Sequence, residues 1–170
     1  MIDGLSAVGL ALAAMAVLGA AAAWTFYVSH RQPRRARATD DVSAALPPER
    51  AVPVDSALVQ QLYRQRGWRH IRPLLADDFV LIGPDGAHAG LDAFRRENAR
   101  LEAIYEDAQS TVEAVLADLE RPAVLYVRSR ERARARRGPD LDVTAWTRIV
   151  VASSGTQVRE LGPSSVIGRA

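Results

Sequence analysis

The sequence contains no cysteine and no lysine. Without cysteine the protein cannot form disulfide bonds, thiolate metal sites or a cysteine nucleophile, which excludes the protein classes that depend on them. All 22 basic residues are therefore arginines. Because alanine is also abundant, we interpret this bias as the codon usage of a GC-rich genome before we interpret it as function. The 170 residues and the 48% apolar share suit one compact domain with an appendage.

Charge is missing from residues 4–29. A helix rises about 1.5 Å per residue, so this stretch is long enough to cross a hydrocarbon core of roughly 30 Å, and we predict a transmembrane anchor over residues 1–30. Three aromatic residues end the stretch and a basic cluster follows it: Trp24, Phe26 and Tyr27, then Arg31, Arg34, Arg35 and Arg37. Positive charge on that side alone predicts a single-pass membrane protein whose C-terminal domain is cytoplasmic.

A cleavable signal peptide is the alternative, because "GAAAAW" offers small residues at which cleavage could occur. The N-terminal "MIDG" favours the retained anchor, since it carries an acid and no basic residue, whereas secretory leaders usually begin with positive charge. Residues 31–53 mix arginine, proline and small residues without apolar periodicity, which predicts a basic juxtamembrane segment and a linker. The folded domain is then expected over residues 54–170.

Apolar periodicity within that domain predicts helices first and strands afterwards. Helices are expected from a cap at 55–56 to residue 66, over 68–76 with an irregularity at Pro73, and over 91–105. Strands are expected at 79–82, 111–119, 123–136, 141–152 and 156–165. This order predicts an α+β domain in which a curved antiparallel sheet wraps around three helices.

One stretch of the domain carries a family resemblance. "GWRHIRPLLADDFVLIGPDGAHAGLDAF" combines a helix, the pair "DD", a strand, a glycine turn and a new helix start, and "GTQVRELGPSS" has the form of a closing strand. Over residues 56–165 this order resembles the SnoaL-like branch of the nuclear transport factor 2-like superfamily. The resemblance implies a cone-shaped domain, a fold that hosts enzymes, ligand binders and dimerisation modules alike.

The acids of one enzyme class in that superfamily have no clear counterpart here. Resemblance to the ketosteroid isomerases places Gly83 where an aspartate base is expected and Thr147 near the position of an acidic hydrogen-bond donor. Only a small register shift could bring Asp85 or Asp142 into those places. The acid pair is therefore not predicted for this chain.

Other catalytic sets are missing too. The SnoaL-type cyclases imply a His and Asp pair on late strands, but all three histidines lie in the first half of the chain: His30, His70 and His88. Asp77 and Asp78 are adjacent and are expected to point in different directions, so they do not make an acid–base pair. No aspartate–arginine–aspartate set of the epoxide-hydrolase type, metal-ligand spacing or phosphate-binding loop is apparent, and we predict no catalytic residue, no metal and no cofactor.

Strict alternation in "AVLYVRSRERARARRGPD" separates an inner row from an outer row. The inner row and residues of neighbouring elements are expected to line a ligand pocket: Phe79, Leu81, Phe94, Val127, Ser129, Glu131, Ala145 and Thr147. Glu131 is the ionisable group expected to point inward from this strand. Buried without a partner it would have a raised pKa, as a general acid or a hydrogen-bond donor to a ligand requires; alternatively it reaches solvent or pairs with an arginine.

The outer row is rich in arginine and allows three interpretations: a solvated face, a dimer interface, or a surface for anions. We predict a homodimer face formed by Tyr126, Arg130, Arg132, Trp146 and Arg148, with Trp146 in the core as the alternative. Nucleic acid is not a predicted partner, because the domain lacks an overall positive charge and an aromatic stacking platform.

These observations predict a membrane-tethered, non-catalytic domain of SnoaL-like type that binds an apolar small molecule or mediates association. The alternative is an isomerase, cyclase or hydratase that acts on an apolar small molecule inside the cone. An enzyme should show at least two polar groups that converge in the interior.

Overall fold

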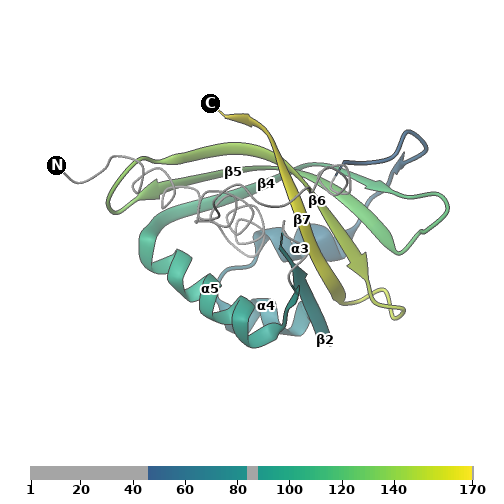
Figure 1. Cartoon of the computed structure of the whole chain (residues 1–170), viewed down its shortest axis with the longest axis horizontal. Coiled ribbons are helices and arrows are strands. Elements are labelled where there is room, and N and C mark those ends of the chain that lie inside the picture. The colour runs from purple at the N-terminus through teal and green to yellow at the C-terminus, as the bar shows by residue number, and fades with distance from the viewer. Residues whose placement is uncertain (1–45, 84–87, 170) are drawn as a thin grey trace, which may run out of the picture.

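The computed structural model describes residues 46–83 and 88–169 (Figure 1). The predicted anchor and the basic cluster lie outside these residues, as does most of the predicted linker. Within the two described ranges, no helix combines the length and the apolar character needed to cross a bilayer.

Among the described residues the helical part consists of three α-helices and one short 3-10 helix: α3 (Ala57–Arg64), α4 (Trp68–Ile71), η2 (Arg72–Leu74) and α5 (Leu91–Ile104). The side chain of Ser56 caps α3 by accepting a hydrogen bond from the backbone N–H of Val59 at 3.3 Å. The prediction of a second helix as far as residue 76 was wrong. Pro73 tightens the chain into a 3-10 turn, and a strand begins directly after it at Leu75.

In the described part of the chain, seven strands form one sheet: β1 (Val52–Pro53), β2 (Leu75–Ile82), β3 (His88–Ala89), β4 (Tyr105–Ala117), β5 (Val124–Ala135), β6 (Leu141–Val151) and β7 (Val158–Arg169). Their order is β1-β4-β5-β6-β7-β2-β3. Strand β7 runs parallel to β2, and the other neighbours are antiparallel. The α+β class is thus confirmed, but the sheet is mixed rather than antiparallel. No hairpin joins β2 to β7, so nothing local fixes their relative direction.

Two boundaries differ from the predicted ones. Strand β4 begins at Tyr105, immediately after α5, instead of at residue 111. A positive φ of 53° at Asp107 and a register shift near it let the chain turn from helix into strand without a loop. Strand β1 pairs with β4 and lies in the segment predicted to be a linker.

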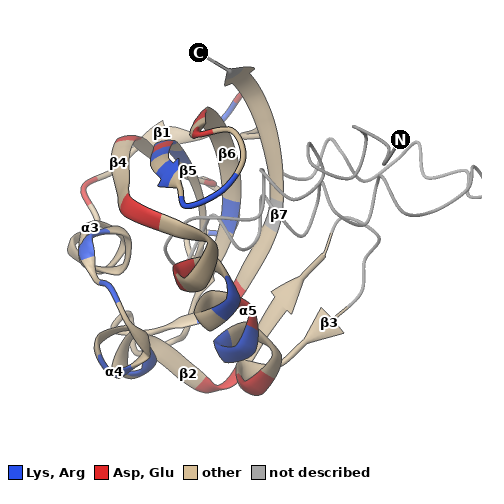
Figure 2. Cartoon of the chain, turned by 90° about the vertical axis from the view of Figure 1, so that its left-hand side faces the viewer, with Lys and Arg blue, Asp and Glu red and all other residues tan. Residues whose placement is uncertain are grey.

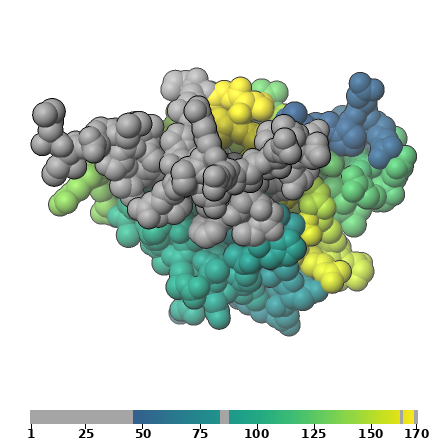
Figure 3. Space-filling view, viewed as in Figure 1, coloured from purple at the N-terminus to yellow at the C-terminus, as the bar shows by residue number. Residues whose placement is uncertain are grey.

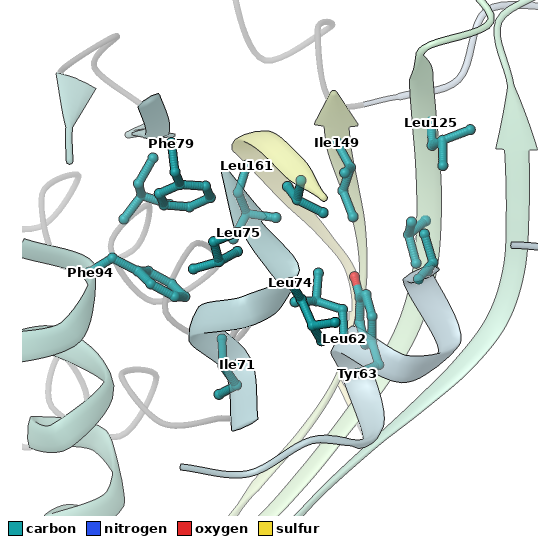
Figure 4. Close-up of a cluster of buried hydrophobic side chains, with 14 of the residues drawn as sticks. Leu62, Tyr63, Ile71, Leu74, Leu75, Phe79, Phe94, Leu125, Ile149 and Leu161 are labelled. Atoms are coloured by element: carbon teal, nitrogen blue, oxygen red, sulfur yellow. The ribbon is translucent and has the colours of Figure 1, made fainter. Parts of the chain in front are cut away.

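The long strands bend over the helices, so the concave face of the sheet and the helices enclose one core (Figure 1). In the space-filling view the helical part, in teal, forms the lower side, and the late strands, in green and yellow, lie above it and to the right (Figure 3). The rings of Phe79 and Phe94 meet with centroids 5.2 Å apart, and Trp68 lies 6.4 Å from Phe94 (Figure 4 shows the two phenylalanines). These contacts fix α5 against β2 and α4, and they leave the inner face of β5 opposite α3.

Candidate functional site

A buried carboxyl group lies on the inner face of β5. Glu131 is 2% exposed and stands in register with Ser110 of β4 and Val143 of β6. The Ser110 hydroxyl donates a hydrogen bond of 2.5 Å to Oε2 of Glu131. The other oxygen, Oε1, is buried and has no hydrogen-bond partner among the described residues. One side of the carboxyl group is therefore held in place, and the other side is left for a further interaction.

Burial raises the pKa of Glu131 from 4.5 to about 7. The hydroxyls of Ser110 and Ser129 and the charge of Arg66 act in the opposite direction and offset only part of this effect. Near neutral pH the group is populated in both protonation states. A carboxyl group in that condition can give or take a proton, which is what a general acid or base requires.

A tyrosine from α3 lies beside this carboxyl group. Tyr63 is 1% exposed, and no described residue makes a hydrogen bond of standard geometry with its hydroxyl, although the hydroxyls of Ser129 and Thr147 lie close to it. Figure 4 shows the ring among the core side chains, with its oxygen directed away from the α3 backbone. Burial and the negative charge of Glu131 raise the pKa of Tyr63, and the nearby hydroxyls of Ser129 and Thr147 lower it. The phenol therefore stays protonated and can donate a hydrogen bond.

An arginine completes the group. Arg66 lies between α3 and α4, is half-buried, and has an Nη1 atom that is shielded from solvent and bonded by none of the described residues. Burial lowers the pKa of Arg66, and the charges of Glu131 and Glu102 raise it. We call the Tyr63 hydroxyl, Glu131 Oε1 and Arg66 Nη1 the three open polar atoms. All three can exchange hydrogen bonds with a ligand, and Glu131 influences the titration of the other two residues.

Further hydroxyls continue from Glu131 across the inner face of the sheet. We call the resulting row the polar strip; it consists of Ser110, Glu131, Ser129, Thr147 and Ser164. Thr147 of β6 and Ser164 of β7 share a buried hydrogen bond of 2.8 Å. On β6, Thr147 pairs with Val127 of β5, and the next inward residue of β5 after Val127 is Ser129. The polar strip therefore crosses the sheet diagonally, from Ser110 on β4 to Ser164 on β7. Polar side chains at these core positions distinguish this part of the interior from the aromatic part around Phe94.

All eight residues predicted to line the pocket are buried. They fall into two groups: Phe79, Leu81 and Phe94 beside the helices, and Val127, Ser129, Glu131, Ala145 and Thr147 on the inner face of β5 and β6. That they bind a ligand stays a prediction.

Sequence reasoning missed four residues of the polar strip and its surroundings: Tyr63, Arg66, Ser110 and Ser164. Tyr63 follows the apolar spacing of its helix, a pattern that predicts packing and gives no sign of a polar role. Ser110 lies before the predicted start of its strand, although the alternation of Ser110 with Val112 would have indicated an inward position.

The positions suggested by the isomerase resemblance have different surroundings. Gly83 is buried and carries no side chain, whereas Thr147 belongs to the polar strip. Asp142 lies on the outer face, where both oxygens accept hydrogen bonds from Arg130 at 2.8 Å, and Asp85 lies outside the described residues. The register shift that could have moved Asp142 inward does not occur.

The adjacent acids Asp77 and Asp78 lie within β2 rather than at a helix exit, and both are exposed. Asp77 pairs with Arg72, and Asp78 pairs with Arg159 of β7 at 2.8 Å. Each acid thus has its own arginine, and the two carboxylates have separate partners. Within the described ranges no three histidine, aspartate or glutamate side chains gather closely enough to hold a metal ion.

From Arg128 onward β5 alternates as predicted, with its arginines on the outer face and Arg128 opposite Trp146, whereas residues 124–127 are all buried. The arginines pair with acids of neighbouring strands, and Figure 2 shows both signs of charge along the sheet. The pairs are Arg128 with Glu113, Arg130 and Arg132 with Asp142, Arg134 with Glu106 and Asp107, and Arg148 with Glu160. A groove of about 280 Å³ lies between these side chains, lined by Gln109, Thr111, Glu113, Arg130 and Arg132.

Trp146 is only partly buried, so it does not belong to the core cluster. Tyr126, which was predicted to share its face, is 4% exposed and offers little surface to a partner.

Comparisons with known proteins point to one family. The sequence model of the SnoaL-like domain matches residues 57–155. AclR of Streptomyces galilaeus, a proposed hydroxylase, superimposes with a TM-score of 0.51 at 12% identity, over 65% of this chain and 70% of that chain. A conserved protein from Planctomyces limnophilus gives a TM-score of 0.46 at 16% identity, over 65% and 92% of the two chains. No curated protein sequence matches. At such low identity the structural similarity to AclR shows the fold alone.

Proposed function

Because the chain belongs to the SnoaL-like domain family, we propose that its cone interior is a proton-transfer site for an apolar carbonyl compound. Glu131 moves the proton, and Tyr63 donates a hydrogen bond to the carbonyl oxygen. The observation that carries this proposal is that two neighbouring buried atoms, the Tyr63 hydroxyl and Glu131 Oε1, have no hydrogen-bond partner of standard geometry among the described residues. This corresponds to the isomerase, cyclase or hydratase alternative of the sequence analysis.

The chemistry balances with the residues present. The Glu131 carboxylate takes a proton from the carbon next to the carbonyl, and the C–H electron pair becomes the C=C bond of an enolate. The negative charge that develops on the oxygen is stabilised by the Tyr63 hydroxyl, as donors in a dry site stabilise an oxyanion. Protonated Glu131 then returns the proton to a carbon of the enolate. A base whose pKa lies near 7 is well matched to both directions of transfer.

The sequence alone favoured a non-catalytic domain, since it showed no acid pair. The buried cluster supports the enzyme instead, because leaving a buried donor or acceptor unsatisfied costs about 1–3 kcal/mol per group. Such groups are uncommon in a core that serves stability only. A ligand that accepts from Tyr63 and meets Glu131 would satisfy both.

Hydrogen–deuterium exchange tests the proposal without knowledge of the natural substrate. In D2O the protein is expected to accelerate exchange of the protons next to the carbonyl of 4-phenylcyclohexanone, measured by NMR. Glu131→Gln should return the rate to that of buffer, and Tyr63→Phe should lower the enzymatic rate about 100-fold. Glu113→Gln, on the outer face, is the matched control and should leave the rate unchanged. Absence of any acceleration by the wild-type protein would contradict the proposal.

The outer face supports a second role, self-association. Trp146 is partly exposed beside Arg128, and the surrounding pairs present both charge signs, which suits contact with a second copy of the same face. Arg130, Arg132 and Arg148, which were predicted to form this face, contribute to it through their ion pairs.

Trp146→Glu tests the association. In the chain without residues 1–45, light scattering is expected to show a dimer for the wild-type protein and a folded monomer for the variant, because a charge replaces an aromatic at the centre of the contact. Thr144→Glu, on the same face of β6, shows the effect of added charge alone. A variant that stays dimeric with an unchanged melting temperature would remove Trp146 from any interface.

The membrane tether over residues 4–29 remains part of the proposal on sequence grounds. It would place the domain beside the bilayer, where apolar small molecules accumulate. The homodimer, the apolar ligand and the cytoplasmic orientation are likewise proposals.

A further inference from the structure

The third open polar atom has no role in the proton transfer. Arg66 Nη1 is shielded from solvent, and the charges of two acids act on this residue: the buried Glu131 and the exposed Glu102 of α5. Glu102 accepts a hydrogen bond of 3.0 Å from Asn98, a buried residue of the same helix. Arg66 therefore lies within electrostatic reach of Glu131, and its buried Nη1 atom has no acceptor among the described residues.

A guanidinium N–H that is removed from water and left without an acceptor is more costly than a neutral group in the same position. An arginine can usually avoid that situation, because its long side chain lets the charged end reach solvent. Arg66 instead follows the C-terminal end of α3, and Gly67, with a φ of 74°, turns the chain directly after it. Arg66 therefore lies in the short connection between α3 and α4, and its Nη1 atom stays shielded from solvent there.

We infer that Arg66 binds a carboxylate of the substrate, so that the substrate class is an apolar carbonyl compound that carries an acid group. This inference rests on the proposed function and gives each of the three open polar atoms a separate role. Arg66 holds the carboxylate, Tyr63 holds the carbonyl oxygen, and Glu131 moves the proton. Arginine suits this task because its planar fork of N–H donors matches the two oxygens of a carboxylate.

Glu131 is the competing partner for Arg66 within the protein. The charged or titratable groups that face Glu131 are Tyr63 from α3 and Arg66 from the segment after it; β4 and β6 contribute Ser110 and Val143. Ser110 donates to Oε2 of Glu131, and neither oxygen of Glu131 accepts a hydrogen bond from Arg66 Nη1, which has no partner among the described residues. If Arg66 served only to pair with Glu131, it would not distinguish an acidic ligand from a neutral ligand of the same shape.

Two probes of the same shape separate these roles. Calorimetric titration of the full chain with 4-phenylbutanoate and 4-phenylbutanamide is expected to show the acid binding at least about tenfold more tightly, as a charge-assisted hydrogen bond predicts. Arg66→Gln should reduce that ratio to about one while the affinity for the amide changes less than about twofold. Arg64→Gln, an exposed arginine at the end of α3, is the matched control and should keep the wild-type ratio. Thermal melts of both variants verify that the fold is retained.

Equal binding of the two probes by the wild-type protein, no binding of either, or an unchanged ratio in Arg66→Gln would overturn the inference. The exchange of 4-phenylcyclohexanone, which has no carboxylate, reports on the proposed function independently. A preference for the acid without any exchange would refute the proton transfer and keep the carboxylate site. Exchange of 4-phenylcyclohexanone together with equal binding of the two probes would keep the proton transfer and refute the carboxylate site.

Discussion

Replacing Gly162 with alanine is expected to prevent stable folding of the domain. Gly162 lies in β7 with a φ of 121°, a conformation that L-residues with a side chain rarely adopt. A Cβ at this position would lie 2.2 Å from the carbonyl oxygen of Ile82 in β2. The obstacle is backbone, which cannot rotate away as a side chain can. Backbone strain of about 1–3 kcal/mol adds to this overlap, so we expect a loss of about 4 kcal/mol or more.

Chemical denaturation followed by circular dichroism measures this loss. Gly168→Ala is the matched control in the same strand, because no described atom lies within 4 Å of its Cβ position and its φ is outside the positive range that disfavours side chains. That variant should remain within about 1 kcal/mol of the wild-type protein. If Gly162→Ala unfolds at nearly the wild-type denaturant concentration, the close approach of β7 to β2 is not a feature of the folded protein.

The same contact shows what the sequence could not predict. Alternation predicted the inner and outer rows of β6, and those of β5 from Arg128 onward, because a strand with one buried face has a period of two residues; Tyr126, which was predicted for the outer row, is buried. The pairing of β7 with β2 depends instead on residues about 80 positions apart along the chain, such as Leu81 and Leu161. Local pattern contains no information on that neighbour, so the parallel pair and the close approach at Gly162 were not predictable.

The sequence likewise predicted one part of the candidate site and not the rest. Glu131 was identified because a lone acid interrupts an apolar and small-residue row, and its burial follows from the same alternation. The predicted alternatives for it, exposure to solvent or pairing with an arginine within hydrogen-bond distance, do not occur among the described residues. Tyr63 and Arg66 could not be assigned, since a tyrosine on the apolar face of a helix normally contributes to packing. Their role depends on the distance from α3 to β5, which only the folded chain determines.

The pH dependence of stability offers a test of Glu131 that needs no ligand. Its pKa is about 7 in the folded protein and about 4.5 in the unfolded chain, so between these pH values the folded state binds more protons. The neutral carboxyl group is compatible with burial, and this contribution to stability is fully present below about pH 4.5. It is lost as the pH rises through 7, because the folded protein must then hold a buried charge. A shift of this size corresponds to about 3 kcal/mol.

Glu131→Gln is expected to remove that loss. The amide has nearly the same shape as the neutral acid and carries no charge at any pH, so near pH 5 the variant should have a free energy of unfolding within about 1 kcal/mol of the wild-type value. At pH 8.5 it should be more stable than the wild-type protein by about 3 kcal/mol. Urea denaturation across this pH range measures the difference in the free energy of unfolding between the two proteins. Groups that titrate alike in both proteins cancel in this difference. Glu113→Gln, on the outer face, should show no comparable pH-dependent gain. The contrary outcome is a Glu131→Gln variant that is less stable than the wild-type protein by the same amount at pH 5 and at pH 8.5. The carboxyl group would then be charged at both pH values, and the proton-transfer role of Glu131 would have no basis.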